Sequence, residues 1–413
     1  MFFLGTAGFY SSSLRNEKKS MFSVAESAIQ SALELGITHI DTANIYGNGE
    51  SETLIGRIFR KDQSLREKIF LQTKCGIKFS KTNNKKLGIA LVGLGGYSTR
   101  ELAPALDGAE FCELKGIVTG TQSKAIKWKK QYNLKESNIF NYDNYDELSK
   151  NKDIDIVYVV LPNSMHKEYT IRALRAGKHV ICEKPMALNA IEAKEMIDVA
   201  KKVGKKLFIG YRLHYDPFHS EIMRLCEEKV YGSVKVFEGG FGFRIGNPSQ
   251  WRLNHSLAGG GALMDVGIYV IQAARYTIGE EPISLTAQEI KTDKVKFKEV
   301  DETILWQMNF PSGAVASNIT TYATNINRFY LGLEKGRIQM SPSYTYRGLA
   351  GVINGKPMNI SPVNQQQKHM DGIAYSLLSN TKAKNIYGDE GLKDMKVIDA
   401  IYKAVKSGKE EAI

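Results

Sequence analysis

A glycine-rich turn constrains the fold of this chain more than any other feature of its sequence. The run Gly93-Leu94-Gly95-Gly96-Tyr97-Ser98 follows a short apolar stretch, 89–92, and opens a stretch that is typical of a helix. Glycines at such a turn allow a tight bend and let backbone N–H groups approach a pyrophosphate at the positive end of the helix. We interpret the run as a dinucleotide-binding fingerprint with Ser98 at its third glycine position. A plain strand-to-helix turn is the alternative.

Apolar stretches of strand length recur after this turn, and helical patterns separate them. Strands that alternate with helices indicate parallel βα units. One helix is predicted from Asn189, which stands three residues before Glu192 in the spacing of a helix start. The predicted strands span 89–92, 114–118, 156–161, 179–182 and 207–209. We therefore expect a Rossmann-type, doubly wound parallel sheet.

From about residue 234 the pattern changes to β-rich runs with turn residues between them. A helical stretch, 262–277, interrupts these runs, and two further helices, 366–378 and 392–406, end the chain. The clearest strands are predicted over 283–290, 303–310, 314–322 and 329–334. This half is expected to be an α+β domain with a large, mostly antiparallel open sheet, whose last helices pack back on the nucleotide-binding domain.

The first 80 residues also alternate strand and helix. Strands are predicted over 4–9, 38–41 and 69–73, and Ser23 and Glu26 have the spacing of a capping box that would open a helix. The polar run 81–86 lacks apolar residues and is typical of a linker. The predicted domains are therefore 1–80, the linker 81–86, a nucleotide-binding domain 87–210 and a substrate-binding domain 211–413.

Length and composition fit a globular protein of two or three domains. The 56 Lys and Arg against 44 Asp and Glu give a net charge of +12, but the basic residues are spread along the chain, which favours a solvated surface over a nucleic-acid track. The four cysteines are widely spaced, and no apolar run approaches the ~18 residues of a membrane span. We expect a cytoplasmic protein without disulfide, metal site or membrane span.

The end of the second strand indicates which dinucleotide binds. Sites that prefer NAD place Asp or Glu there, to accept a hydrogen bond from the ribose 2′-hydroxyl. This strand ends in Val118-Thr119-Gly120-Thr121, with Lys124 close by and no acid. A carboxylate would repel a 2′-phosphate, whereas Thr119 and Lys124 would bind one. NADP is therefore favoured, and NAD stays possible.

Two later strands end in residues that could carry chemistry. Leu161-Pro162-Asn163-x-x-His166 ends a central strand, where open α/β sheets bind ligands. Glu183-Lys184-Pro185 ends the next strand. A lysine held beside a cofactor is well placed for proton transfer, although Lys184 taken alone is equally a solvated loop residue.

A run of three glycines, Gly259 to Gly261, precedes a third group of candidates. Such glycines permit a backbone to approach a ligand or another backbone closely. Asp265 and Tyr269 follow, four residues apart and so on one helical face. A carboxylate and a phenol on one face could act together on a sugar hydroxyl. A helix start with an ordinary Asp and a packed Tyr is the equal alternative.

Seven motifs in order extend these observations over residues 87–413. They are Leu161-Pro-Asn-Ser, Ala176-Gly-Lys-His-Val, Cys182-Glu-Lys-Pro-Met-Ala187, Gly210-Tyr-Arg-x-His-Tyr-Asp-Pro217, Trp251-Arg-Leu, Leu257-Ala-Gly-Gly-Gly-x-Leu-Met-Asp265 and Gly279-Glu-Glu-Pro282. Together they resemble the glucose–fructose oxidoreductase/inositol dehydrogenase family.

The resemblance implies roles for the candidate residues. The family's catalytic lysine falls on Lys184, its acid on Asp265 and its proton-transferring residue on Tyr269, where many relatives carry His. Positions that line the nicotinamide and the sugar fall on Tyr211, Arg212, Trp251 and Arg252.

The implied reaction is hydride transfer between a sugar carbon and NADP. Tyr269 would take the hydroxyl proton, with help from Asp265 and from the positive charge of Lys184. If the cofactor is retained, two sugars exchange a hydride through it; if it dissociates, the enzyme is a simple aldose dehydrogenase or reductase. A cofactor-bound sensor without turnover is a further alternative.

Residues 1–80 resemble a second family, the aldo-keto reductases. The matching runs are Gly36-Ile-x-His-Ile-Asp41-Thr-Ala-x-x-Tyr46-Gly, Glu50-Ser-Glu-x-x-Ile-Gly56 and Thr73-Lys74. Asp41, Tyr46 and Lys74 match three members of that family's catalytic tetrad, and the histidine is missing. Three βα units cannot close an eight-stranded barrel. We expect a truncated (β/α)-barrel fragment without reductase activity of its own.

Aromatic residues in the predicted sheet suggest association. They are Trp306, Phe310, Tyr322, Phe329 and Tyr330, more than one helical layer readily covers. An open sheet pairing with its copy would bury them, so a homo-oligomer, a dimer or a tetramer, is expected.

Overall fold

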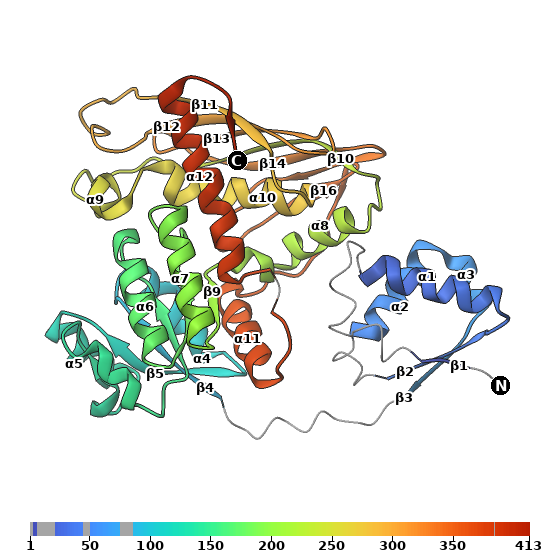
Figure 1. Cartoon of the computed structure of the whole chain (residues 1–413), viewed down its shortest axis with the longest axis horizontal. Helices are drawn as coiled ribbons and strands as arrows, with labels where there is room; N and C mark the ends of the chain where they lie inside the picture. Colours follow the sequence, from blue (N-terminus) through green and yellow to red (C-terminus); the bar gives the residue numbers. More distant parts are fainter. Residues whose placement is uncertain (1–2, 6–20, 44–49, 75–85, 384) are drawn as a thin grey trace. The chain divides into compact units, whose positions relative to one another are not determined.

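The structure is a computed structural model that describes residues 3–5, 21–43, 50–74, 86–383 and 385–413. The chain divides into two compact units, Met1–Asn84 and Lys85–Ile413 (Figure 1). Each unit is built around its own β-sheet core.

The first unit contains a parallel sheet in the order β1-β2-β3. Its elements are β1 (Phe3–Gly5), α1 (Met21–Glu34), β2 (His39–Ala43), α2 (Glu50–Lys61), α3 (Gln63–Glu67) and β3 (Phe70–Lys74). The predicted alternation of strand and helix is confirmed. Buried Ile29, Ile40, Ile55 and Ile58 form the centre of its core.

Two local predictions for this unit need comment. Ser23 does not begin α1, because the helix starts at Met21 and Ser23 lies within its first turn. Buried Phe22 and Ala25 belong to the unit's core, so packing extends the helix past the capping signal. Of the strand predicted over 4–9, residues 6–9 lie outside the described residues.

The second unit begins with the predicted Rossmann sheet. Its six parallel strands lie in the order β6-β5-β4-β7-β8-β9. They are β4 (Leu87–Val92), β5 (Cys112–Val118), β6 (Ile139–Phe140), β7 (Ile156–Val159), β8 (His179–Cys182) and β9 (Leu207–Ile209). The strand order reverses between β4 and β7, and the carboxyl ends at such a switch point are where open α/β sheets bind ligands.

Helices connect these strands and cover the sheet (Figure 1). They are η3 (Ser98–Leu102), α4 (Ala103–Asp107), α5 (Gln122–Gln131), η4 (Glu136–Asn138), η5 (Tyr145–Lys150), η6 (Asn163–Met165), α6 (His166–Arg175) and α7 (Ala190–Lys202). The predicted start of α7 is confirmed, because the Asn189 side chain accepts a hydrogen bond from the backbone N–H of Glu192 at 2.9 Å.

A nine-stranded sheet follows, in the order β17-β16-β15-β14-β10-β13-β12-β11-β18. Every pair is antiparallel except β10 with β13, so the prediction of a mostly antiparallel sheet is confirmed. The strands are β10 (Val234–Gly242), β11 (Ser284–Ile290), β12 (Thr303–Asn309), β13 (Val315–Thr321), β14 (Ile326–Leu333), β15 (Gly336–Met340), β16 (Gly351–Ile353), β17 (Lys356–Pro357) and β18 (Glu411–Ala412).

Further helices of this unit lie between its two sheets or beside the Rossmann sheet (Figure 1). They are η7 (Arg212–Tyr215), α8 (Pro217–Glu227), η8 (Trp251–Leu253), α9 (His255–Ala258), η9 (Leu263–Gly267), α10 (Ile268–Ile278), α11 (Gln365–Leu378) and α12 (Gly388–Ser407). Helix α10 packs on β10 and β13, α11 contacts α4 and β5, and α12 contacts α7 and β11. The last two helices therefore contact elements of the Rossmann sheet and of its covering helices.

The aromatic argument for association was wrong. Trp306, Phe310, Tyr322 and Phe329 are 1–2% exposed, because helices and loops of the same chain cover the inner face of the sheet. Only Tyr330 of the five is half-buried. Association of copies therefore stays a prediction, without support from these side chains.

One stretch among the described residues, His255–Ile278, is long and apolar enough to resemble a membrane span. Within the folded chain, 83% of its most apolar window is buried. It is therefore a core segment, and it carries Asp265 and Tyr269 between the two sheets.

A buried carboxylate locks the last helix to the rest of the unit. Asp394 of α12 is 0% exposed and accepts hydrogen bonds from Tyr211, which precedes η7, and from Gln272 and Arg275 of α10. Arg275 also pairs with Glu281 and Glu390. The Asp394 carboxylate therefore connects three segments that are distant in sequence: α12, α10 and the residue before η7.

We predict that Asp394→Ala destabilises the protein by about 3 kcal/mol, because Arg275 and Tyr211 would lose a buried anionic partner. Urea denaturation followed by circular dichroism measures this. Lys396→Ala, on the exposed side of the same helix, should stay within about 0.5 kcal/mol of the parent. Equal midpoints for the two variants would contradict the prediction.

Candidate active site

Lys184 extends from the carboxyl end of β8 to the helical segment that carries Asp265. Its ammonium group donates to the backbone carbonyl of Asp265 at 2.6 Å, and Nζ lies 3.5 Å from the carboxylate Oδ1. The side chain is only 13% exposed. Lys184 is therefore not a solvated loop residue, and it joins the Rossmann sheet to the second sheet's helices.

Asp265 lies in η9 and has three side-chain partners. Besides Lys184, Arg252 Nε and the Tyr322 hydroxyl each donate to Oδ2 at 3.0 Å. Burial alone would raise the pKa of Asp265, but Arg252, Lys184 and the Tyr322 hydroxyl together hold that pKa below its ordinary value. The carboxylate is therefore charged at neutral pH and is shared by two cations, Lys184 and Arg252.

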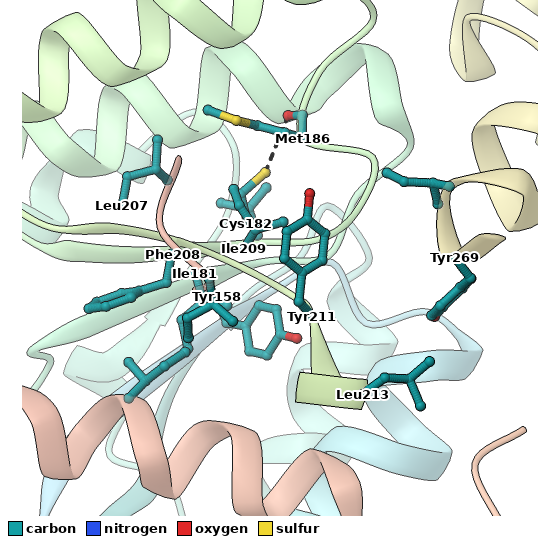
Figure 2. Packing of buried hydrophobic residues seen from close by; sticks show 14 of the residues in the cluster. Tyr158, Ile181, Cys182, Met186, Leu207, Phe208, Ile209, Tyr211, Leu213 and Tyr269 are labelled. Atoms are coloured by element: carbon teal, nitrogen blue, oxygen red, sulfur yellow. Dashed lines mark hydrogen bonds between the residues drawn. The ribbon is translucent and has the colours of Figure 1, made fainter. Parts of the chain in front are cut away.

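Tyr269 lies one helical turn beyond Asp265 and is 8% exposed. Its ring centroid is 4.8 Å from Lys184 Nζ and 5.1 Å from the guanidinium carbon of Arg212. Figure 2 shows Tyr269 reaching from its helix toward the packed ends of the parallel strands. The structure therefore brings Lys184, Asp265 and Tyr269 together, with Arg212 beside them.

The three glycines before Asp265 serve the protein's own packing. A Cβ on Gly261 would lie 2.0 Å from the backbone carbonyl oxygen of Asp301, and one on Gly260 would lie 1.9 Å from the Tyr402 hydroxyl. The Asp301 carboxylate accepts the N–H groups of Gly261 and Leu263 at 2.6 and 2.8 Å. The glycines therefore allow the close approach of another part of the chain and not of a ligand. Asp301 thereby fixes the start of the helix.

The glycine-rich turn has the shape that a dinucleotide needs. Gly93 has φ +91°, and a Cβ there would lie 2.5 Å from the carbonyl oxygen of Val160. The Ser98 hydroxyl closes the turn by donating to the Gly93 carbonyl at 2.6 Å. A Cβ on Gly95, in contrast, would meet nothing within 4 Å. The turn is thus tight on its protein side and open on the side where a pyrophosphate would bind.

The residues predicted to select the dinucleotide lie beside this turn. Lys124 Nζ donates to the carbonyl of Leu94 at 3.2 Å. Thr119 is 7% exposed, and its hydroxyl accepts from the N–H of Thr121 at 3.2 Å. Lys124 therefore carries its charge to the glycine-rich turn, as a phosphate-binding role requires.

Several predicted ligand contacts are engaged with the protein instead. His166 has one ring nitrogen 2.9 Å from the Leu161 carbonyl and the other 2.8 Å from the Pro185 carbonyl. Burial lowers the pKa of His166 to about 4, so the ring is neutral and donates to one of these two carbonyls while it lies between the two strand ends. Asn163 donates to the carbonyl of Ala258 at 2.8 Å. The side chains of His166 and Asn163 therefore contact backbone carbonyls of the protein and hold these segments in place.

Glu183 and Tyr211 are also held internally. Glu183 accepts from the Tyr158 hydroxyl at 2.6 Å, and burial raises its pKa. Tyr211 is 3% exposed and gives its hydroxyl to Asp394. Figure 2 shows Tyr158 and Tyr211 within the packed cluster. The Tyr211 hydroxyl is therefore engaged with α12, and its predicted sugar contact stays a prediction.

Trp251 lies next to Arg252, whose guanidinium carbon is 4.6 Å from the indole ring. The indole also lines an open cavity of about 800 Å³ formed by residues 246–257 and 293–299. Arg252 reaches Asp265, whereas Trp251 faces this cavity. Arg252 therefore belongs to the group around Asp265, whereas Trp251 belongs to the wall of the cavity.

Sequence reasoning missed Tyr322 and Tyr346 as neighbours of the site. The sequence pattern indicates for Tyr322 only an aromatic residue of a strand, whereas in the structure its hydroxyl donates to Asp265. Tyr346 stacks on Tyr97 of the glycine-rich turn, with ring centroids 5.8 Å apart. Neither belongs to a recognisable motif, so no local signal could have found them.

Comparison with known proteins agrees with this geometry. Residues 87–211 match the model described as an oxidoreductase family with an NAD-binding Rossmann fold, and residues 219–339 match the GFO/IDH/MocA C-terminal domain. Trans-1,2-dihydrobenzene-1,2-diol dehydrogenase of Xenopus tropicalis is 30% identical over 288 residues, which cover 66% of this chain and 84% of that protein. The chain belongs to the GFO/IDH/MocA oxidoreductase family.

Two further relatives are informative. D-xylose 1-dehydrogenase [NADP(+)] of Haloarcula marismortui is 27% identical over 76% of this chain and 90% of its own length. The crystal structure of aldose-aldose oxidoreductase from Caulobacter crescentus is 40% identical, with a TM-score of 0.77 over 80% of this chain and all of that one. Residues 2–90 match the aldo/keto reductase family, which confirms the second resemblance.

Two glycine substitutions, one on each side of the turn, test whether its open side binds the pyrophosphate. Gly95→Ala should leave stability within about 0.5 kcal/mol, since its Cβ meets no atom within 4 Å. It should weaken NAD(P)H binding by at least about tenfold, because the methyl group occupies the space where backbone approaches phosphate. Nucleotide fluorescence titration and thermal unfolding measure the two effects.

Gly93→Ala is the counterpart. Its positive φ and the carbonyl of Val160 predict a loss of about 2 kcal/mol or more in stability. A Gly95→Ala protein that binds the nucleotide as the parent does would show that the open side of the turn is not the phosphate site.

Proposed function

We propose that this chain is an NADP-dependent sugar oxidoreductase. The observation that carries the proposal is the group of Lys184, Asp265 and Tyr269, which lies at the carboxyl edge of a Rossmann sheet. A xylose dehydrogenase and an aldose-aldose oxidoreductase among the relatives support a sugar as the substrate. The intact group argues against a sensor without turnover, since such a protein has no chemical need for these residues.

In the proposed mechanism Tyr269 takes the proton of the reacting sugar hydroxyl. Tyr269 acts here as the phenolate, and Lys184, 4.8 Å from its ring, stabilises the negative charge that Tyr269 carries before it takes the proton. Asp265 holds Lys184 in place and prevents two uncompensated cations at the site. A bound nicotinamide would supply the hydride acceptor for the sugar carbon that bears this hydroxyl. Reduction of a sugar carbonyl uses the same residues in reverse.

A two-sugar reaction is favoured over a simple dehydrogenase. In the two-sugar reaction one retained cofactor is reduced by a first sugar and reoxidised by a second. The 40% identity to an aldose-aldose oxidoreductase supports this version. The xylose dehydrogenase relative supports the alternative with an exchangeable cofactor. Native mass spectrometry of the purified protein separates them, because a retained cofactor would add its mass to the chain.

We infer also that residues 1–80 have no reductase activity of their own, and that the protein is cytoplasmic and associates with copies of itself. The first inference follows from the missing histidine of the tetrad. Compartment and association stay predictions.

The cofactor preference predicts that NADP(H) binds more tightly than NAD(H). Lys124→Ala should weaken NADP(H) binding by about tenfold and leave NAD(H) nearly unchanged, because only NADP(H) carries the 2′-phosphate. Fluorescence titration with both nucleotides measures this. Equal losses for the two nucleotides would place Lys124 at the shared pyrophosphate.

The mechanism predicts that Tyr269→Phe keeps cofactor binding and loses turnover. General acid–base groups contribute about 10²–10⁴-fold, so kcat should fall by that order. Steady-state kinetics on a panel of aldoses and ketoses measures kcat, and nucleotide titration checks the binding.

Tyr46→Phe, a tyrosine of the aldo-keto reductase match that lies outside the described residues, is the control. It should change sugar turnover by less than about twofold, because three βα units cannot form that family's site. Unaltered turnover in Tyr269→Phe would refute the assignment of the proton-transferring group.

A further inference from the structure

A short segment between β15 and β16, residues 341–350, is held firmly by the rest of the second unit. Asn327 Oδ1 accepts the backbone N–H groups of Ser343 and Tyr344 at 2.7 and 2.8 Å. The Thr345 carbonyl accepts hydrogen bonds from Gln365 and Arg212, both at 3.3 Å. The backbone that precedes Tyr346 is therefore fixed by side chains from three other elements.

The side chain of Tyr346 projects from this fixed backbone. Its ring lies 4.4 Å from the guanidinium carbon of Arg212 and stacks on Tyr97 at an angle of 27°. The residue is 40% exposed, whereas Tyr269 is 8% exposed. Within the described part of the chain, no hydrogen-bond partner is found for the Tyr346 hydroxyl.

Arg212 connects this tyrosine to the reacting group. Its guanidinium carbon is 5.1 Å from the Tyr269 ring and 4.4 Å from the Tyr346 ring, so the two phenols flank one cation. Arg212 is 2% exposed, and its guanidinium group donates to the carbonyls of Tyr344 and Thr345 and to the side chain of Gln365. Tyr346 is thus an accessible phenol beside Tyr269, on a rigid support.

We propose that Tyr346 is a substrate-positioning residue, whose hydroxyl bonds a sugar hydroxyl other than the one that reacts. The proposal rests on the proposed function. A sugar carries several hydroxyls that lose water when it enters a site, and each then needs a protein partner. A phenol that is fixed in place, lacks a partner and lies next to the proton-transferring residue can supply one at little entropic cost.

The contact would also contribute to specificity. A site built to bond a particular hydroxyl discriminates against analogues that lack it, because its own polar group is then left unpaired. Tyr346 therefore distinguishes sugars by the presence of a hydroxyl at one position of the ring.

Tyr346→Phe removes the hydroxyl and keeps the stacking on Tyr97. We expect kcat/KM for the best aldose of the panel to fall by about tenfold, mainly through KM, because one neutral hydrogen bond is lost. The affinity for NADPH, measured by fluorescence, should be unchanged. Tyr330→Phe, on the sheet away from this group, is the matched control and should behave as the parent.

Monodeoxy analogues of that aldose make the test specific. For one analogue, the one that lacks the bonded hydroxyl, parent and Tyr346→Phe should have the same kcat/KM. For the other analogues the difference between the two enzymes should persist. A merely structural role for Tyr346 would lower kcat/KM for every analogue alike, and that result would overturn the proposal.

Two other outcomes would also overturn it. Weaker NADPH binding with an unchanged sugar KM would assign Tyr346 to the cofactor, and unchanged kinetics would leave it without a role. Both require that the parent turns over sugars. A parent enzyme without any sugar turnover would instead overturn the proposed function, and this inference with it.

Discussion

The arrangement of the second unit depends on one buried carboxylate. Asp265 receives Lys184 from the Rossmann sheet, Arg252 from η8 and Tyr322 from the end of β13. Removing a partner from a buried ion pair leaves an uncompensated charge, which costs several kcal/mol. The same carboxylate therefore joins two sheets and fixes the cation that faces Tyr269. Because Asp265 holds the two sheets together and also positions Lys184, a substitution there would affect both stability and the candidate active site.

The start of the helix that carries Asp265 shows how that carboxylate is placed. The Asp301 carboxylate accepts the N–H groups of Gly261 and Leu263, and Tyr402 of α12 donates to the same carboxylate at 2.7 Å. Because a side chain at Gly260 or Gly261 would collide with these groups, only glycine permits the approach. The position of the reacting group is thus set partly by the last helix of the chain.

Features with a local cause could be predicted from the sequence. The order of strands and helices follows from apolar periodicity, the start of α7 from Asn189, and the Rossmann sheet from the glycine-rich turn. Contacts between distant segments could not be predicted. Nothing near Tyr211 indicates that its hydroxyl bonds Asp394, and nothing near His166 indicates that its ring joins two carbonyls. The sequence placed Trp306 on a predicted strand, but nothing near it indicates that helices of the same chain cover its side chain.

The contrast between local sequence patterns and contacts of distant segments also applies to the first unit. In β2, Ile40 and Thr42 are buried in the core, whereas the alternate residues His39 and Asp41 are half-buried on the opposite face. On that face the His39 ring lies 5.1 Å from Phe70, which is 62% exposed. In a complete eight-stranded barrel this face would point inward and be packed. The unit has therefore kept the interface between helices and sheet, which local periodicity encodes, while its described residues do not enclose a barrel interior. A reductase site of that barrel type needs this enclosure, and for this reason we propose that the chemistry of this chain belongs to the second unit.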